Sequence, residues 1–461
     1  MNIQWQHKDH NRQGSIVICL LVFFLLLFGG NAQGQILSAG AARVEITPVT
    51  NMLNWVGHQP YSGVLDPIFV RALVLSDGAN RVAILAWDLV DTREGIVAKI
   101  RAVIAKSSGI PATNILINAS HTHSAPWAPA VDDPLLAHER KTLLPVEQGP
   151  ACREWSENLP ERCAEAVRNA EAARRPATLA IGRASVGEVL FNRRPVREDG
   201  KVETTFEPAD PFVLPNGHRF GPVDPTLTVL VLRDEKGKTI ATLFNLPCHS
   251  VCIYPYYQGI SADWPGAVSA GLQDALGGEA LFLQGCAGDI VPARRGLEAR
   301  DQMARFIRNR ALTAITNSHP LMPAQFRLAN VSLELPLTEA AQRDTKAPTI
   351  KTEVQVIACG TLALVGLPGE PLIGLATEIQ RRSPFPHTVV LGYSNGGGVQ
   401  YVGIPGDKAR GGYEMTEAGA GDDNCGQLLV DAATKALNQL AATPAKNLPS
   451  RALEQKQKDL R

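Results

Sequence analysis

Five apolar runs in this chain each lead into a polar or metal-binding side chain, and this pattern constrains the fold more than any other feature of the sequence. The runs are NILINAS, TIATLFNLPC, ALFLQGCAG, TLALVGLPG and TVVLGYSNGGGVQ. The polar groups that follow them are His121 and His123, His249, Asp289, Glu370 and Tyr401. In open α/β sheets, functional sites lie outside the carboxyl ends of the strands. The pattern therefore predicts that five strands bring these groups to one assembled site.

The rest of the chain predicts strands interspersed with helices. Apolar spacing predicts helices over residues 95–107, 159–173, 267–275, 300–316 and 426–440. Strand signals lie at 81–89, 114–119, 178–190, 226–233, 239–246, 280–283, 325–335, 352–358, 361–366 and 388–392. Residues 125–155 are rich in proline and charge and predict a long loop. The expected class is α/β, with mixed sheets flanked by helices in a single large domain.

The N-terminus predicts export. Lys8 and Arg12 precede an apolar run, 16–28, and a small-residue segment follows it, which is the pattern of a secretory signal peptide. The run is shorter than the ~20 residues of a membrane-spanning helix. We expect a signal peptide at 1–34, one domain at 35–441 and a disordered polar tail at 442–461. The expected product is soluble and periplasmic or secreted, and the alternative is a leader retained as an anchor.

Charge and cysteine content exclude some classes of protein and of metal site for this chain. Lys plus Arg is 45 and Asp plus Glu is 45, so the zero net charge argues against a nucleic-acid-binding protein. Cys19 leaves with the leader, and the other seven cysteines are an odd number, so at least one thiol is unpaired. Cys152 and Cys163 flank a short polar segment and are one candidate disulfide. Repeated CxxC spacing is absent, which argues against a cysteine-rich zinc site.

Two imidazoles and a carboxylate at strand ends are the ligands of a catalytic zinc site. Such a site leaves one coordination position for water, and zinc lowers the pKa of that water toward ~7. A further histidine near the metal can move protons. Each residue also has an ordinary interpretation, because a histidine after a strand is often a hydrogen-bonded structural residue. Spacing alone leaves both interpretations open.

An ordered set of motifs resembles the neutral ceramidase family, the non-lysosomal ceramidases. The motifs run in the family's order from about Gly40 to Leu440, the span of its catalytic domain. They are AGAARVEITP, INASHTHSAP, FNRRP, LPCHS with ISADWPG, CAGDIVP, LPGEP, and QYV followed by Tyr413-Glu414.

The resemblance implies a role for each matching residue. One zinc ion per chain would be bound by His121, His249, Glu370 and Tyr401. His123 would be the nearby acid/base, Arg193 would hold the amide oxygen as it gains charge, and Tyr413 would assist it. The implied reaction is hydrolysis of the N-acyl amide bond of ceramide, with a lipid substrate and transient contact with a membrane surface.

The chain also departs from the family's pattern. Val291 stands where the family has a serine often proposed as catalytic, so a serine nucleophile at that position is excluded. Ala125-Pro126-Trp127 replaces a glycine pair, and residues 403–407 replace a Thr-Thr-Pro-Glu-Glu stretch. We expect no counterpart of the family's C-terminal β-sandwich domain. These departures weaken the inference of a lipid substrate more than the inference of a metal site.

Two alternatives to a ceramidase follow from the departures. One is a related zinc hydrolase of another N-acyl or ester substrate. The other is a catalytically inactive binding protein on the same scaffold, which Val291 favours. Asp88 and Asp289 either orient the site or cap backbone N–H groups at strand ends. Asp263 is predicted to be a turn residue, and Arg294 and Arg295 are either a solvated pair or a contact for an anionic head group.

Overall fold

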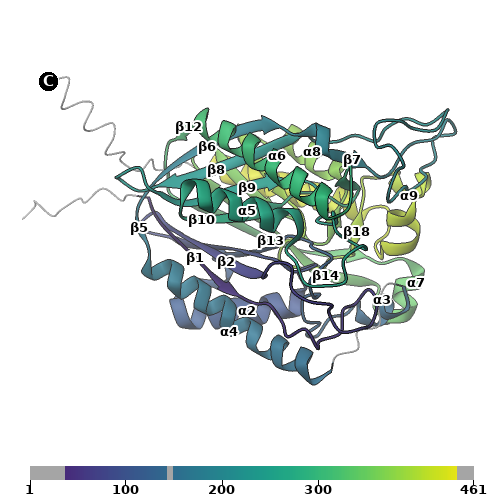
Figure 1. Ribbon diagram of the computed structural model, residues 1–461, viewed down its shortest axis with the longest axis horizontal. Helices are drawn as coiled ribbons and strands as arrows, with labels where there is room; N and C mark the ends of the chain where they lie inside the picture. The colour runs from purple at the N-terminus through teal and green to yellow at the C-terminus, as the bar shows by residue number, and fades with distance from the viewer. Residues whose placement is uncertain (1–36, 143–148, 444–461) are drawn as a thin grey trace, which may run out of the picture. The chain divides into compact units, whose positions relative to one another are not determined.

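The computed structural model describes residues 37–142 and 149–443 (Figure 1). The predicted signal peptide lies outside these residues, and so does the predicted tail beyond residue 443. Within the described ranges, no helix is both long and apolar enough to cross a membrane.

Strands of the described residues form three larger sheets and two short ribbons. The first sheet has the order β4-β3-β2-β1-β5, with β1 Ser38–Glu45, β2 Phe69–Ser76, β3 Arg81–Trp87, β4 Ile115–Ala119 and β5 Arg175–Pro176. The second has the order β10-β9-β8-β6-β12, with β6 Thr178–Ser185, β8 Thr226–Arg233, β9 Thr239–Leu246, β10 Glu279–Gln284 and β12 His319–Leu321. The third has the order β13-β14-β15-β17, with β13 Arg327–Pro336, β14 Thr349–Cys359, β15 Leu362–Gly366 and β17 His387–Leu391. The ribbons pair β7 Leu190–Asn192 with β11 Ile290–Pro292, and β16 Glu370–Pro371 with β18 Tyr401–Val402.

Each larger sheet carries one parallel pair of strands at an edge. The pairs are β3 with β4, β9 with β10, and β15 with β17, while the other pairings in these sheets are antiparallel. Strands β4 and β15 are buried along their whole length, which explains why they are continuous apolar runs rather than alternating ones. The expected α/β class with mixed sheets is confirmed.

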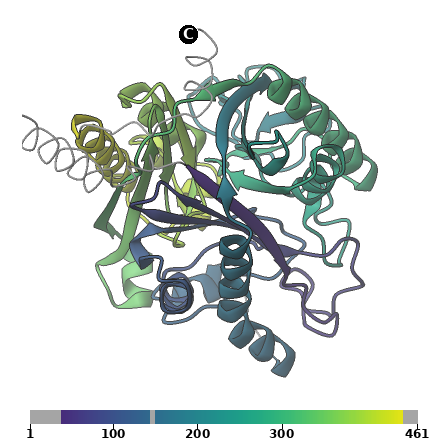
Figure 2. The ribbon, with the colours of Figure 1, turned by 90° about the vertical axis from the view of Figure 1, so that its left-hand side faces the viewer.

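Helices cover the outer faces of the three sheets (Figure 2). Helices α2 Glu94–Ser108 and α4 Pro150–Ala172 pack on the first sheet, α5 Asp263–Leu276 and α6 Leu297–Thr316 on the second, and α8 Ile373–Arg382 and α10 Cys425–Ala442 on the third. Between the sheets, one apolar cluster joins side chains of all three, among them Leu73, Leu243 and Leu364. The shared core therefore fixes how the sheets face one another.

The predicted loop over 125–155 is wrong in its second half. Helix α3 spans Leu136–Thr142, and α4 begins at Pro150 rather than at the predicted Leu159. Proline is favoured at the first position of a helix, because its missing N–H has no intrahelical partner there. The first turns of α4 are mostly polar, so the apolar spacing that predicts a helix begins only at Leu159 and continues through Cys163 and Val167.

The candidate disulfide between Cys152 and Cys163 is also wrong. Both residues lie in α4, eleven positions apart, and neither is joined to the other. At ~1.5 Å of rise per residue their Cα atoms are about 16 Å apart, whereas a disulfide needs less than ~7 Å.

Candidate metal centre

Two buried side chains hold the ends of the three sheets together. The Asn118 side-chain amide donates to the Gly392 carbonyl at 2.7 Å and accepts from the Gln284 backbone N–H at 2.7 Å. The Gln284 side-chain amide donates to the carbonyls of Ser120, at 3.1 Å, and Cys248, at 2.8 Å. These residues follow or end β4, β9, β10 and β17. The carboxyl ends of the parallel pairs therefore meet at one place, as the sequence pattern predicts.

His121 and His249 project into this meeting point from the ends of β4 and β9. Both are fully buried, and their ring centroids are 4.5 Å apart. Nδ1 of His121 lies 2.5 Å from the Val90 carbonyl, and Nδ1 of His249 lies 2.7 Å from the Ala287 carbonyl. Since each Nδ1 lies against a carbonyl, the Nε2 atom of each ring faces the centre of the site. Backbone carbonyls hold metal-binding histidines in this way.

Glu370 supplies a carboxylate to the same point. Its Oε2 is 3.2 Å from His121 Nε2 and 3.5 Å from His249 Nε2. Burial raises the pKa of Glu370, but the two imidazoles outweigh it and hold this pKa well below its usual value. Burial, Arg193 and His121 lower the pKa of His249 to about 3. Glu370 is therefore an anion and His249 a neutral base at neutral pH.

This donor set fits a zinc ion. Two imidazole nitrogens and a carboxylate oxygen converge with their electron pairs, which repel one another unless a cation lies between them. Ligand atoms ~2.1 Å from a tetrahedral zinc are about 3.4 Å from each other, and the observed separations of Glu370 Oε2 from the two nitrogens are 3.2 and 3.5 Å. A proton shared by His121 and Glu370 is the other cation that fits.

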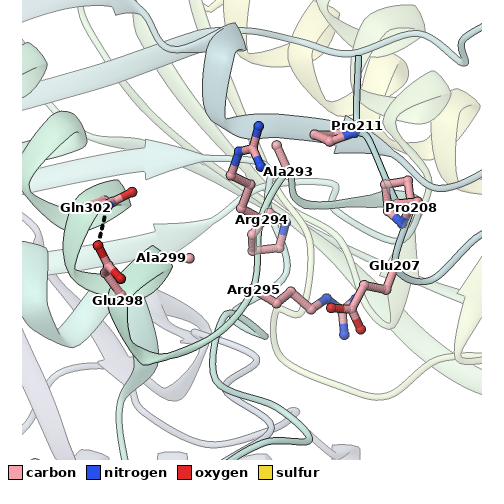
Figure 3. A pocket seen from close by; sticks show the side chains of 11 residues that line it. Glu207, Pro208, Pro211, Ala293, Arg294, Arg295, Glu298, Ala299 and Gln302 are labelled. Carbon is pink, nitrogen blue, oxygen red and sulfur yellow. Dashed lines mark hydrogen bonds between the residues drawn. The ribbon is translucent and has the colours of Figure 1, made fainter. Parts of the chain in front are cut away.

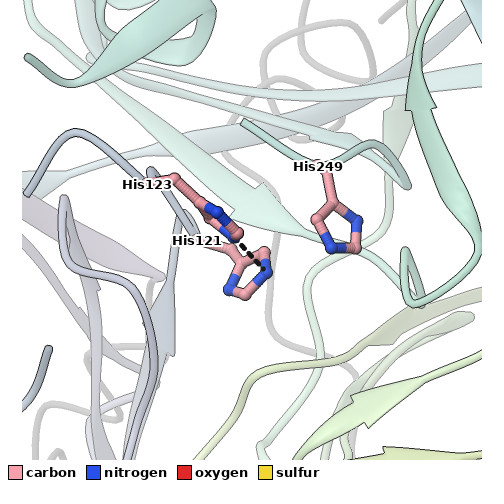
Figure 4. Close-up of side chains that lie close together, drawn as sticks. All are labelled: His121, His123 and His249. Carbon is pink, nitrogen blue, oxygen red and sulfur yellow. Dashed lines mark hydrogen bonds between the residues drawn. The ribbon is translucent and has the colours of Figure 1, made fainter. Parts of the chain in front are cut away.

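His123 stands beside this group but is held differently. Its Nε2 is 3.1 Å from His121 Nε2, and ligand atoms of His121, His123 and His249 all lie within 4.8 Å of one another (Figure 4). Its Nδ1 is buried and has no hydrogen-bond partner among the described residues. Burial, His121 and His249 place the pKa of His123 well below its usual value. The three histidines could bind a metal together, or His123 could act beside it.

Arg193 and Tyr401 lie on the other side of the centre. Arg193 follows β7, and its Nη2 donates to the Tyr401 hydroxyl at 3.0 Å. Its Nε donates to Glu414 at 2.7 Å, and its Nη1 is 3.5 Å from His249 Nε2. Tyr401 pairs in register with Glu370 across the parallel ribbon of β16 and β18. The structure thus brings Glu370, Tyr401 and Arg193 together. The hydrogen bond between Arg193 and Tyr401 joins residues that are 208 positions apart in the sequence.

A cavity of about 400 Å³ opens beside the histidines. Its lining includes six aromatic side chains besides the histidines: Trp55, Trp127, Phe206, Tyr254, Tyr401 and Tyr413. His123 contacts this wall edge-on, with ring centroids 5.2 Å from Trp55 and 5.0 Å from Tyr254. Burial raises the pKa of Tyr413 to about 12, so its hydroxyl keeps its proton. The cavity offers an apolar aromatic surface next to the polar centre.

The remaining strand-end carboxylates support the site rather than line it. Asp289 accepts from the Asn192 side chain at 2.9 Å and from the Ile373 backbone at 2.8 Å. Asp88 forms an ion pair with Arg71 at 2.6 Å. Asp263, predicted as a turn residue, begins α5 and accepts from the Ile253 backbone at 3.1 Å.

Tyr393 is a site residue that the sequence reasoning missed. Its hydroxyl lies 3.3 Å from Glu370 Oε2, its ring centroid is 4.4 Å from that of His121, and it is fully buried. It lies two residues after the end of β17 and has a left-handed φ of 49°, and His121 has a φ of 61°. Such conformations are costly and gather at functional sites. The signal was present in the sequence, because Tyr393 is the first polar side chain after the run TVVLG.

Val291 lies away from this chemistry. It belongs to β11, is fully buried, and packs in an apolar cluster with Phe191, Val251 and Ala293. It is not among the residues that line the cavity. The valine that favoured an inactive binding protein is therefore a packing residue here.

Comparisons with known proteins identify the fold. No family model and no curated protein matches the sequence. The crystal structure of neutral ceramidase from Pseudomonas aeruginosa superimposes with a TM-score of 0.69 at 16% identity, covering 91% of this chain and 77% of that chain. A structure described as ceramidase complexed with C2 gives a TM-score of 0.68 at 16% identity, with 90% and 77% covered. This chain therefore has the fold of neutral ceramidase.

Proposed function

We propose that this chain is a zinc-dependent amidohydrolase that cleaves the N-acyl amide bond of ceramide to a fatty acid and a sphingoid base. Zinc would be held by His121, His249, Glu370 and Tyr401. The observation that carries the proposal is the convergence of two imidazole lone pairs and a carboxylate, at 3.2 and 3.5 Å, in the wall of an aromatic cavity. The ceramidase fold supports it.

When bound, zinc supplies a Lewis acid for the amide carbonyl and lowers the pKa of water. The protein's own part begins with placement of the ligands. The carbonyls of Val90 and Ala287 hold the two imidazoles, and the Tyr393 hydroxyl is placed to donate to Glu370. Rigid ligands keep the metal in one position relative to the cavity.

His123 is proposed as the proton carrier. Its ring contacts both His121 and the aromatic wall, and its Nδ1 has no carbonyl partner within the described ranges. Burial and the neighbouring imidazoles favour its neutral form, which can accept a proton from water and return it to the leaving amine.

Arg193 is proposed to meet the charge that grows on the amide oxygen. It is buried, its position is held by Glu414, and it lies beside both Tyr401 and His249. A fixed cation in a buried site stabilises an oxyanion more than water does. The protonated Tyr413 hydroxyl lines the same cavity and can donate a second hydrogen bond.

The test is release of fatty acid from ceramide by the purified protein, with and without a chelator. We expect hydrolysis that stops when the metal is removed and returns when zinc is added. A His121→Ala, His249→Ala double variant should lose both the zinc and the activity. Hydrolysis of N-acyl amino acids without any hydrolysis of ceramide would contradict ceramide as the substrate and leave a zinc amidohydrolase of another N-acyl compound.

A further inference from the structure

A second cavity has a volume of about 360 Å³, and Figure 3 shows the side chains that line it. Arg295 and Glu207 line both cavities, so the two meet at these side chains. The second cavity is otherwise walled by Arg294, by Glu298 and Gln302 in the first turns of α6, and by small or proline residues. The aromatic cavity and the more polar one therefore share Arg295 and Glu207 as part of their walls.

Arg295 is incompletely satisfied by the protein. Its Nη2 donates to the Phe206 carbonyl at 2.7 Å and its Nη1 to the Tyr254 carbonyl at 3.3 Å. Its Nε is buried and has no hydrogen-bond partner in the described part of the chain. Burial also lowers the pKa of this guanidinium, as expected for a cation whose charge is not fully compensated.

The carboxylates near the two arginines are already engaged. Glu207 accepts a hydrogen bond from the Tyr256 hydroxyl, and its charge raises the pKa of Arg295 against the larger lowering by burial. Glu298 accepts from the Gln302 side chain at 2.8 Å. Arg294 is exposed and forms no ion pair with any described residue. The arginines and carboxylates cancel in formal charge, and the exposed side chain of Arg294 offers hydrogen-bond donors that no described carboxylate engages in an ion pair.

We propose that this second cavity binds an anionic group of the substrate, which favours N-acyl compounds that carry a carboxylate, such as N-acyl amino acids, over neutral ones of equal acyl chain. The inference rests on the proposed amide hydrolysis and specifies its substrate class. The amide lies at the histidines, the apolar part in the aromatic cavity, and the carboxylate at Arg294 and Arg295. Arginine is suited to this role because its planar donors match a carboxylate in pairs.

The experiment compares two soluble amides with the same acyl chain, N-octanoylglycine and its neutral analogue N-octanoylethanolamine, on the zinc-loaded protein. We expect kcat/KM to be about tenfold higher for the anionic amide, the gain of one charge-assisted contact. The Arg294→Gln, Arg295→Gln double variant should raise KM for N-octanoylglycine about tenfold more than for the neutral amide. Arg305→Gln is the matched control, because Arg305 is an exposed arginine on α6 outside the cavity.

Binding of the same two compounds, followed by fluorescence of the cavity tryptophans, separates the two hypotheses. Protein that binds the anionic amide more tightly in an arginine-dependent way, yet hydrolyses neither, supports this inference and contradicts the proposed hydrolysis. Protein that binds and hydrolyses both alike, or that loses its preference equally with Arg305→Gln, overturns the inference alone. Protein that binds neither overturns it as well.

Discussion

The two sides of the aromatic cavity, which we call the ligand side and the substrate side after the proposed function, are built in opposite ways. On the ligand side, His121, His249 and Glu370 are buried, and each has a second hydrogen-bonding partner that fixes its direction. On the substrate side, His123 Nδ1 and Arg295 Nε have no partner among the described residues. The ligand side is thus arranged to hold one fixed charge. The substrate side keeps hydrogen-bonding capacity for a molecule that enters from outside.

The source of the partners explains part of this difference. Backbone carbonyls of Val90 and Ala287 hold the two ligand histidines, so the hold depends on the course of the chain rather than on particular side chains. The substrate side is formed by side chains from separate loops, including Trp55, Phe206 and Tyr254. We expect changes on the ligand side to abolish the reaction and changes on the substrate side to alter its rate or selectivity.

The largest effect is expected for His249→Ala. Loss of an outer partner of a metal ligand costs ~10–100-fold in metal affinity or activity, so loss of the ligand itself should cost more than about 100-fold in both. Zinc content by mass spectrometry and amide hydrolysis are the measurements. His319→Ala is the control, because His319 is exposed on β12. A His249→Ala protein that keeps both zinc and activity would break the comparison.

His123→Ala sharpens the comparison, because it separates a ligand from a proton carrier. We expect kcat to fall by ~10²–10⁴-fold while zinc content stays near one ion per chain. Zinc should remain because His121, His249 and Glu370 still converge. If the variant instead loses its zinc, His123 belongs to the ligand side as a third imidazole.

Asn118→Ala tests whether the ligand side depends on the junction of the three sheets. The substitution leaves the buried N–H of Gln284 without its side-chain acceptor, whereas the Gly392 carbonyl keeps the Ser394 hydroxyl as a donor. An unsatisfied buried group costs ~1–3 kcal/mol, so the free energy of unfolding should fall by about 2 kcal/mol in urea titrations. Asn216→Ala, at an exposed loop position, should change it by less than ~0.5 kcal/mol. Equal effects would mean that the junction is unimportant.

Val291→Ser is expected to have the smallest effect on activity. The new hydroxyl would lie in the apolar cluster with Phe191 and Ala293 rather than in the cavity. Burial of an unpaired hydroxyl should lower the free energy of unfolding by ~1–3 kcal/mol. Amide hydrolysis should stay within about twofold of the parent chain once folded protein is compared. A large gain in activity would show that the substrate side needs a hydroxyl here.

Much of the ligand side could be predicted from the sequence. Each ligand follows a continuous apolar run, and burial of a strand on both faces leaves that pattern in a short stretch of chain. The prediction that five strand ends meet at one place agrees with the structure for His121, His249, Glu370 and Tyr401. The sequence pattern could not assign these strands to three separate sheets, because the junction at Asn118 joins residues up to 276 positions apart.

The substrate side could be predicted only in part. Arg193 and Tyr413 came from the family resemblance, while Trp55, Phe206 and Tyr254 lie in irregular segments whose side chains show no periodic pattern. Pairing of Arg193 with Glu414 also depends on tertiary packing, since the two are 221 positions apart. The helix from Pro150 was hidden for a local reason, because its first turns are polar and lack the apolar spacing on which helix prediction depends.

The central claim is that one zinc ion, held on the ligand side, is needed for amide hydrolysis. The most direct test is titration of metal-free protein with zinc while bound zinc and the rate of amide hydrolysis are measured together. We predict that activity rises in proportion to bound zinc and reaches its limit at one ion per chain. Full activity in zinc-free protein, or one bound zinc without hydrolysis of any N-acyl amide, would contradict the account.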